Sequence, residues 1–236
     1  MKIAIMQPYF YPYIGYLSLI KHTDRFIILD VVQYIYHGWI ARNRILKPGN
    51  GWQYIKVPVK SHTHETCICD VEIHDLNKAQ RRITAQLDHY RKKAPFFREV
   101  MNMCKDTFSG NYSDITSLNC AALESILEYL GIDRAIEVFS KMELCIELPK
   151  SADEWSLNIC KSLGNVSEYW NPPGGKSFFD REKFMNNGIE LRFHEVDITP
   201  YDQKRSVFEP GLSILDVLMF NSVEDTNAML DRFILS

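Results

Sequence analysis

Residues 6 to 16 contain an unusual density of side chains that can bind a ligand. They read Met-Gln-Pro-Tyr-Phe-Tyr-Pro-Tyr-Ile-Gly-Tyr and lie between two apolar runs, at 3–5 and 17–20. The pattern indicates a strand, a stiff loop and the start of a helix, because the two prolines fix their own φ and restrict the residues before them. Open α/β folds bind ligands at the carboxyl ends of their strands. We therefore expect Gln7, Tyr9, Tyr13 and Tyr16 to line a site.

A second group of reactive side chains follows an expected strand and occupies residues 30 to 44. It comprises Asp30, His37, Trp39, Arg42 and Arg44. Arginine suits bidentate binding of a phosphate or carboxylate, and tryptophan can stack on a sugar or a base. A carboxylate or imidazole with a pKa of about 7 can accept the proton of an attacking amine. We expect Asp30 or His37 to do this; the alternative is a solvated hairpin with ordinary surface charges.

A third candidate is the turn 171–177, which reads Asn-Pro-Pro-Gly-Gly-Lys-Ser. Backbone N–H groups at a Gly-Gly turn before a helix can bind an anion, so Gly174 and Gly175 are expected to bind substrate. The spacing to an earlier glycine that a Walker motif requires is absent. The alternative is a plain turn between a strand and a helix.

Four residues of metal-binding type are spaced along one expected loop, at His62, His64, Cys67 and Cys69. These types suit zinc, but the spacing differs from that of zinc fingers. We assign no metal. A zinc site is one interpretation of these residues, and a polar loop with two thiols is the other. No Ser-His-Asp or nucleophilic cysteine arrangement is evident.

Composition restricts the class of protein. The chain has 236 residues, 46% of them hydrophobic, 24% charged, and a net charge of −3. These values are typical of a globular domain and favour neither a nucleic-acid partner nor a membrane surface. No run of about 18 apolar residues predicts a membrane span. The six cysteines, without a secretion signal, point to free thiols in the cytoplasm.

The expected elements alternate in the manner of an α/β fold. A strand–helix–strand unit begins the chain, and its parallel pairing by a right-handed crossover is the default. We expect one α/β domain over 1–236, with a Rossmann-like parallel sheet, flanking helices, a mostly helical insertion around 77–131 and a helical C-terminal part. Expected strands are 2–6, 25–29, 53–59, 71–73, 135–139, 166–170 and 190–194; expected helices are 14–21, 77–92, 96–108, 114–130 (stopped by Gly131), 152–163, 181–187, 213–221 and 223–233.

The first loop resembles the nucleotidyltransferase superfamily, in which His-x-Gly-His opens the first helix and handles ATP phosphates. The stretch here is Tyr13-Ile14-Gly15-Tyr16, and the Leu-Ser-Leu-Ile run after it is similar to that of pantothenate synthetases. Tyrosine can donate a hydrogen bond to a phosphate but offers no imidazolium. The loop therefore leaves open whether the protein uses ATP or an acyl thioester as the donor of a transferred group. The alternative is that Gly15 permits close packing and the aromatic residues are core.

A set of short motifs is spread along nearly the full length of the chain, at 7–16, 32–34, 38–40, 42–43, 57–59, Tyr90 with 94–97, 174–175 with 179–180, 188–191, Tyr201, Gln203, Phe208 and 212–216. Together these stretches resemble the WbqC-like protein family. Two departures are Val31, where the family has a second Asp, and Ala41, where it has Asn.

This resemblance implies a role in bacterial surface polysaccharide synthesis, commonly of the O-antigen of lipopolysaccharide. Some family members are labelled glycine or amino-acid transferases. We expect an N-acyl or aminoacyl transferase, with glycyl as one option, that acts on a nucleotide-linked amino sugar, with Gln33 and Asn43 added to the substrate-binding residues. The alternative is a non-catalytic sugar-nucleotide-binding or accessory protein of the same pathway. The sequence leaves the sugar, the donor and the oligomeric state open.

Overall fold

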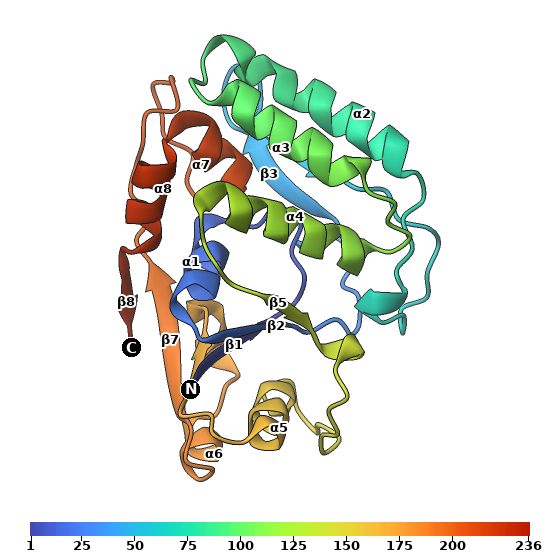
Figure 1. Cartoon of the computed structure of the whole chain (residues 1–236), viewed down its shortest axis with the longest axis vertical. Helices are drawn as coiled ribbons and strands as arrows, with labels where there is room; N and C mark the ends of the chain where they lie inside the picture. The colour runs from blue at the N-terminus through green and yellow to red at the C-terminus, as the bar shows by residue number, and fades with distance from the viewer.

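The computed structural model describes all 236 residues and is built on a six-stranded sheet in the order β5-β2-β1-β6-β7-β8. The first five strands in this order are parallel, and β8 pairs antiparallel with β7. This mostly parallel sheet, with helices on both faces, confirms the expected α/β class (Figure 1). The bounds are β1 Lys2–Met6, β2 Arg25–Ile28, β5 Ile136–Val138, β6 Glu168–Asn171, β7 Glu190–Val196 and β8 Phe233–Leu235.

Successive side chains of β1 and β2 point alternately into two hydrophobic cores. Ile3, Ile5 and Ile27 face a smaller core under α5 (Glu154–Leu163) and α6 (Arg181–Met185). Ala4 and Phe26 face a larger core. This follows from the two-residue period of strands, which sends successive side chains to opposite faces. The larger core lies under α1 (Ile14–His22), α4 (Ile115–Leu130), α7 (Ile214–Phe220) and α8 (Val223–Leu230).

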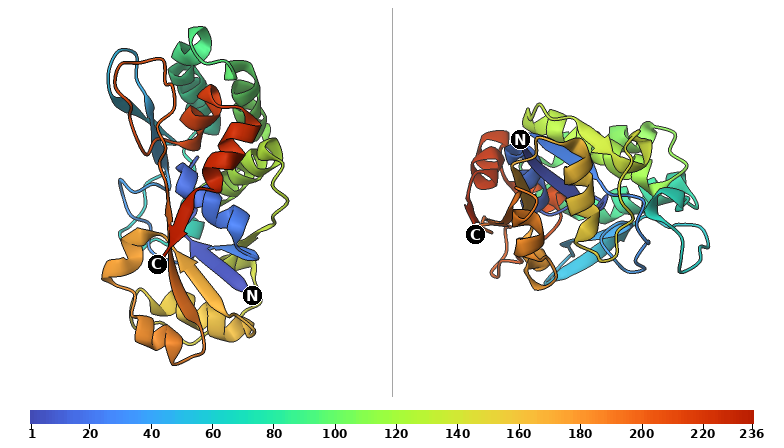
Figure 2. Two further views of the ribbon diagram at one scale, coloured as in Figure 1. Left: turned by 90° about the vertical axis from the view of Figure 1, so that its left-hand side faces the viewer. Right: turned by 90° about the horizontal axis from the view of Figure 1, so that it is seen from below.

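A second layer extends from the larger core, away from α5 and α6 (Figures 1 and 2). It contains the antiparallel hairpin of β3 (Arg42–Leu46) and β4 (Trp52–Lys56), together with α2 (Leu76–Leu87) and α3 (Phe97–Ser109). Ile45 and Ile55 are fully buried, whereas Arg42 and Arg44 stay partly exposed on the opposite face of β3. The hairpin therefore has one apolar face that packs on the helices and one face rich in cations.

Helix termini follow ordinary capping chemistry. Asp75 and Asp114 each accept a hydrogen bond from a backbone N–H in the first turn of α2 and α4. Such a cap contributes about 1 kcal/mol. Gly131 ends α4 with φ +67°, as its predicted stop requires. None of the helices is long and apolar enough to cross a lipid bilayer.

Some element predictions need correction. The expected strand at 71–73 makes only isolated bridges, at Glu72 and Ile73. The expected helix 223–233 ends at Leu230, because β8 pairs with β7 from Phe233 onward. Residues 88–92 continue α2 as the 3₁₀ helix η2 (Asp88–Lys92), and β3 was not predicted as a strand. The early end of α8 follows from the pairing of β8 with β7, whereas β3 pairs with the neighbouring strand β4 in a hairpin.

Candidate functional site

A large pocket lies at the topological switch point of the sheet, where the strand order reverses. The chain passes from β1 to β2 and β5 on one side, then returns to β6 on the other side of β1. The carboxyl ends of β1 and β6 thus diverge into separate loops, and ligands bind at such switch points in open α/β sheets. A pocket of about 620 Å³ opens here, lined by Ile5, Met6, Gln7, Tyr9, Leu29, Val32, Gln33, Ile35, Ala152, Trp155, Ser156, Tyr169, Asn171, Pro172, Gly174, Gly175, Phe178 and Phe179. We call it the switch-point pocket.

Uncharged side chains alone line the switch-point pocket, and many of them are apolar or aromatic. Its polar side chains are the amides of Gln7, Gln33 and Asn171, the hydroxyl of Ser156, and two tyrosines. Burial raises the pKa of Tyr9 and of Tyr169, so both phenols are neutral at physiological pH. The pocket therefore offers stacking surfaces and hydrogen bonds, but no ionised acid or base.

The Gly174–Gly175 turn forms one wall as the short 3₁₀ helix η4 (Pro173–Ser177). A Cβ on Gly175 would lie 2.0 Å from Asn171 Nδ2, so the buried Asn171 amide occupies the space that a side chain would need. Asn171 Nδ2 donates to the Pro172 carbonyl at 2.9 Å, and its Oδ1 accepts from the Tyr169 hydroxyl at 3.1 Å. The strand end and the turn are thereby held as one unit.

The opening loop 7–13 is held by side chains from distant elements. Tyr16 Oη donates to the Gln7 carbonyl at 2.8 Å, and Asn119 Nδ2 donates to the Pro8 carbonyl at 2.8 Å. Asn43 Nδ2 donates to the carbonyls of Phe10 and Tyr11 at 3.1 and 2.9 Å. Ser213 Oγ also donates to Tyr11, at 2.7 Å. Side chains thus satisfy four of the loop carbonyls, which fixes the backbone that carries Gln7 and Tyr9 into the pocket.

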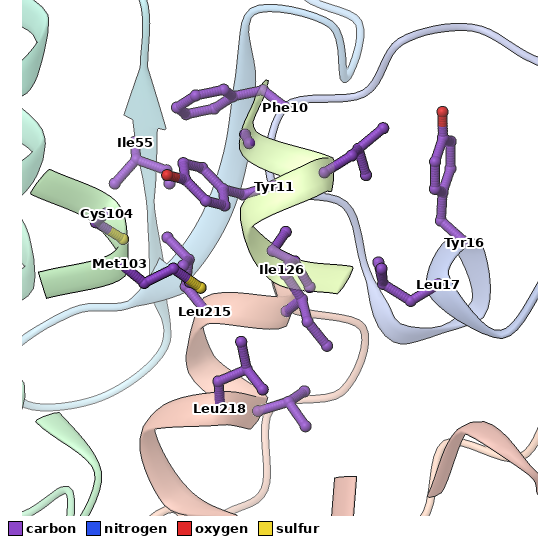
Figure 3. Close-up of a cluster of buried hydrophobic side chains, with 14 of the residues drawn as sticks. Phe10, Tyr11, Tyr16, Leu17, Ile55, Met103, Cys104, Ile126, Leu215 and Leu218 are labelled. Carbon is purple, nitrogen blue, oxygen red and sulfur yellow. The ribbon is translucent and has the colours of Figure 1, made fainter. Parts of the chain in front are cut away.

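The loop's aromatic residues divide between site and core. Tyr11 is fully buried, and its ring lies near Ile55 and Cys104, whereas Tyr16 extends from α1 on the other side of α4 (Figure 3). Tyr16 is also fully buried, which raises the pKa of its phenol well above the usual value. Tyr13 is partly exposed, and its ring lies within 2.6 Å of the position that a Cβ on Gly15 would take. Gly15 therefore allows Tyr13 to fold back on α1, as the packing alternative expected.

Asp30 and His37 lie outside the lining of the switch-point pocket. Asp30 is 1% exposed, and its two oxygens accept from the backbone N–H of Ser140 at 3.0 Å and from the Ser140 hydroxyl at 2.6 Å. Its carboxylate therefore joins the loop after β2 to the turn after β5. His37 is exposed, has φ +65°, and stacks on Tyr36 with ring centroids 4.0 Å apart.

Trp39, Arg42 and Arg44 lie on or beside the hairpin and not in the pocket lining. The Arg44 guanidinium lies over Trp39 at 5.4 Å and over Trp52 at 5.2 Å, and it donates to the Gly211 carbonyl at 3.0 Å. Arg42 lies 4.1 Å above the Tyr54 ring and donates to the His37 carbonyl. The arginines therefore hold the hairpin face in place.

The residues 62–69 do not converge. Gln33 Nε2 contacts His64 Nδ1 at 2.8 Å and its carbonyl at 2.5 Å, which joins the pocket rim to this loop. Burial, with nearby carboxylates, raises the pKa of Cys69 to about 11, so its thiol is protonated. No group of three or more His, Cys, Asp or Glu side chains that could hold a metal ion occurs in the structure.

The structure brings together five of the residues expected at a site, namely Gln7, Tyr9, Gln33, Gly174 and Gly175. It adds residues that sequence reasoning missed, mainly Trp155, Ser156, Tyr169, Asn171, Phe178 and Phe179. Asn171 carries a detectable signal, since it directly follows an expected strand and begins the predicted turn 171–177. Trp155 and Ser156 resemble ordinary residues in the first turn of a helix, and only the fold brings α5 to the strand ends.

Comparison with known proteins gives the same assignment as the sequence pattern. The model of the WbqC-like protein family matches residues 7–228. The uncharacterized protein Rv1507c of Mycobacterium tuberculosis (strain ATCC 25618 / H37Rv) is 32% identical to this chain over 224 residues, which cover 93% of each protein. No solved structure is significantly similar. The chain belongs to the WbqC-like protein family.

Proposed function

We propose that this protein binds a nucleotide-linked amino sugar in the switch-point pocket and transfers an acyl or aminoacyl group, such as glycyl, to the sugar amine. The observation that carries the proposal is the pocket of about 620 Å³ at the carboxyl ends of β1 and β6. This volume lies in the usual range for small-molecule sites, and the position is where open α/β sheets bind nucleotides. Family membership supports a pathway of bacterial surface polysaccharide synthesis, with O-antigen as the expected product.

Each part of such a ligand has complementary groups in the pocket. Trp155, Phe178 and Phe179 offer ring faces against which a base or a sugar can stack. The Gln7 and Gln33 amides can bind sugar hydroxyls or base edges. Because no cation lines the pocket, we assign the phosphates to the open mouth and to the backbone N–H groups of the Gly174–Gly175 turn.

The transfer itself requires an amine that is already neutral, since no carboxylate or imidazole lines the pocket to deprotonate it. With an acyl thioester, the amine nitrogen bonds to the carbonyl carbon, the C–S bond breaks, and the amine proton passes to the leaving thiolate. With ATP, a carboxylate first displaces pyrophosphate to form an acyl adenylate. The amine nitrogen then bonds to the carbonyl carbon, the C–O bond to AMP breaks, and the amine proton passes to water. Tyr9 is the partly exposed phenol of the loop that lines the pocket, and Tyr13 is partly exposed farther along the loop. Asp30, Tyr16 and Asn43 would position the loops.

The six cysteines are all unpaired. Free thiols are typical of proteins in a reducing compartment. We therefore place the reaction in the cytoplasm.

The test combines binding with product detection. Isothermal titration calorimetry with a panel of nucleotide-linked amino sugars should give a measurable affinity. Trp155→Ala should weaken it by about tenfold or more, because one stacked aromatic ring contributes about 1–3 kcal/mol. Trp52→Ala, on the exposed face of the hairpin, is the matched control and should retain wild-type affinity. Absence of binding, or equal effects of the two substitutions on affinity, would refute ligand binding in the switch-point pocket.

A second candidate is a non-catalytic protein that binds the same sugar nucleotide for another enzyme of the pathway. The uncharged lining of the pocket favours it. Mass spectrometry after incubation with glycine and ATP, and separately with acyl thioesters, distinguishes the two candidates. An acylated sugar identifies the transferase; binding without product across donors and acceptors identifies the accessory protein.

A further inference from the structure

A smaller cavity of about 180 Å³ lies in the second layer and shares no residue with the switch-point pocket. Its walls come from η2, from the turn between β3 and β4, and from the loop 201–211. His89, Lys93 and Arg205 line it, together with Tyr90, Gln203 and Gly49. We call it the basic cavity.

The cations of the basic cavity have no acidic partner. Neither Lys93 nor Arg205 forms an ion pair, and no Asp or Glu lines the cavity. Arg205 is nevertheless fixed in place, because its guanidinium donates to the carbonyls of Lys47 and Gly51, the latter at 3.0 Å. The lining therefore carries two cations, one of them a rigidly oriented guanidinium.

His89 adds an unpartnered polar atom. Its Nδ1 lies 2.7 Å from the Gln86 carbonyl, which can only accept, so Nδ1 carries the proton and donates. Nε2 then holds a lone pair in the neutral ring, and it is buried without any hydrogen-bond partner. Burial lowers the pKa of His89, with Arg205 and Lys93 acting in the same direction, so the neutral ring prevails at pH 7. A buried acceptor of this kind needs a donor that the protein does not supply.

The nearby carboxylates are already engaged or lie outside the cavity. Asp88 pairs with Arg91. Asp216 is buried behind the wall, where it accepts from the hydroxyls of Tyr90 and Tyr201, each at 2.5 Å, and from Gln203 at 3.0 Å. Glu209 is near Gly51 and does not line the cavity.

We propose that the basic cavity is a second ligand site, which binds a phosphate group that retains one O–H. The negative oxygens would accept from Lys93 and Arg205, and the remaining O–H would donate to His89 Nε2. Inorganic hydrogenphosphate carries that O–H at pH 7. A monoester, whose second pKa is about 6, has largely lost it. Sulfate presents acceptors alone and leaves Nε2 unpartnered. The site therefore prefers hydrogenphosphate to sulfate, independently of the activity proposed for the switch-point pocket.

The test is calorimetric titration of the full-length protein with sodium phosphate, sodium sulfate and glycerol phosphate at pH 7.5 and constant ionic strength. We expect phosphate to bind most tightly. Lys93→Gln should weaken binding by about tenfold or more, since it removes a charge-assisted hydrogen bond. Lys92→Gln, at an exposed neighbour outside the cavity, should leave it unchanged.

The outcomes separate the components of the proposal. Undetectable phosphate binding at 10 mM (about the weakest affinity of interest), or equal binding by the wild type and Lys93→Gln, overturns the site. Sulfate binding as tight as phosphate overturns the role of His89 Nε2. His89→Leu should abolish the preference for phosphate over sulfate while some affinity for both persists. Tighter binding of glycerol phosphate than of phosphate would support the site but refute the requirement for the O–H. It would indicate a phosphorylated small molecule as the ligand.

Discussion

The contact between Gly175 and Asn171 gives the sharpest test of how the pocket wall is built. In Gly175→Ala, the new Cβ would lie 2.0 Å from Asn171 Nδ2 and 3.0 Å from Phe179 Cδ2. Unstrained contacts begin near about 3.5 Å, so the buried Asn171 amide must move by about 1.5 Å. That movement breaks its hydrogen bonds to the Pro172 carbonyl and the Tyr169 hydroxyl.

The expected cost follows from those two bonds. Leaving a buried polar group unpaired costs about 1–3 kcal/mol, so Gly175→Ala should lower the free energy of unfolding by about 2–4 kcal/mol. Gly174→Ala is the matched control, because nothing lies within 4 Å of the position that its Cβ would take. It should be neutral or stabilising by up to about 1 kcal/mol, since alanine reduces the entropy of the unfolded chain.

Urea denaturation followed by circular dichroism measures both variants, and an unchanged m-value keeps the comparison valid. In an Asn171→Ala background, Gly175→Ala should cost much less, because the group that it displaces is gone. If Gly175→Ala matches Gly174→Ala within about 0.5 kcal/mol, a typical limit for surface changes, then the Asn171 contact does not hold this wall.

Three further predictions concern buried polar groups. Burial raises the pKa of Asp216 to about 6, so the folded state retains a proton that the unfolded chain releases near pH 4. The wild type should therefore gain up to about 3 kcal/mol over Asp216→Asn as the pH falls from 7 to 4, measured by urea denaturation at each pH; parallel curves would contradict this. Burial lowers the pKa of His194 to about 4, so its contribution has the opposite sign. Between pH 6.5 and 4 the wild type should lose up to about 3 kcal/mol relative to His194→Gln, and a difference that does not vary with pH would exclude a neutral buried ring. Asn43→Ala should cost about 2–4 kcal/mol in thermal or urea unfolding, because it removes the donor to Phe10 and Tyr11 and the acceptor for the Arg44 N–H. Asn111 is exposed, so Asn111→Ala should leave the free energy of unfolding unchanged. Equal effects of the two substitutions would refute the role of Asn43 in holding the loop.

The strand–loop–helix at the N-terminus was predictable because its signals are local. Apolar runs, two prolines and Gly15 act within a few residues of one another, and the structure has β1 and α1 where the pattern predicts them. The Gly174–Gly175 turn was predictable for the same reason. Strand β8 was not, because its residues continue a helical pattern until pairing with β7 overrides it.

The roles of individual polar residues were harder to predict. Asp30 resembles a catalytic base in the sequence, yet Ser140, 110 residues away, binds both of its oxygens. Arg42 and Arg44 resemble phosphate ligands, yet the tyrosine and tryptophans of the hairpin lie against them. A residue type states which bonds a side chain can form, whereas its neighbours decide which bonds it does form.

The sequence by itself determined the α/β class, the family and the loop that carries Gln7 and Tyr9. These depend on periodicity and on residues adjacent in the chain. Only the tertiary structure decided that β6 lies on the far side of β1, so that Trp155 and Asn171 meet Gln7 in one uncharged pocket. The physical reason is that strand order and side-chain partners are set by packing and hydrogen bonds between segments more than 100 residues apart, and no local pattern encodes them.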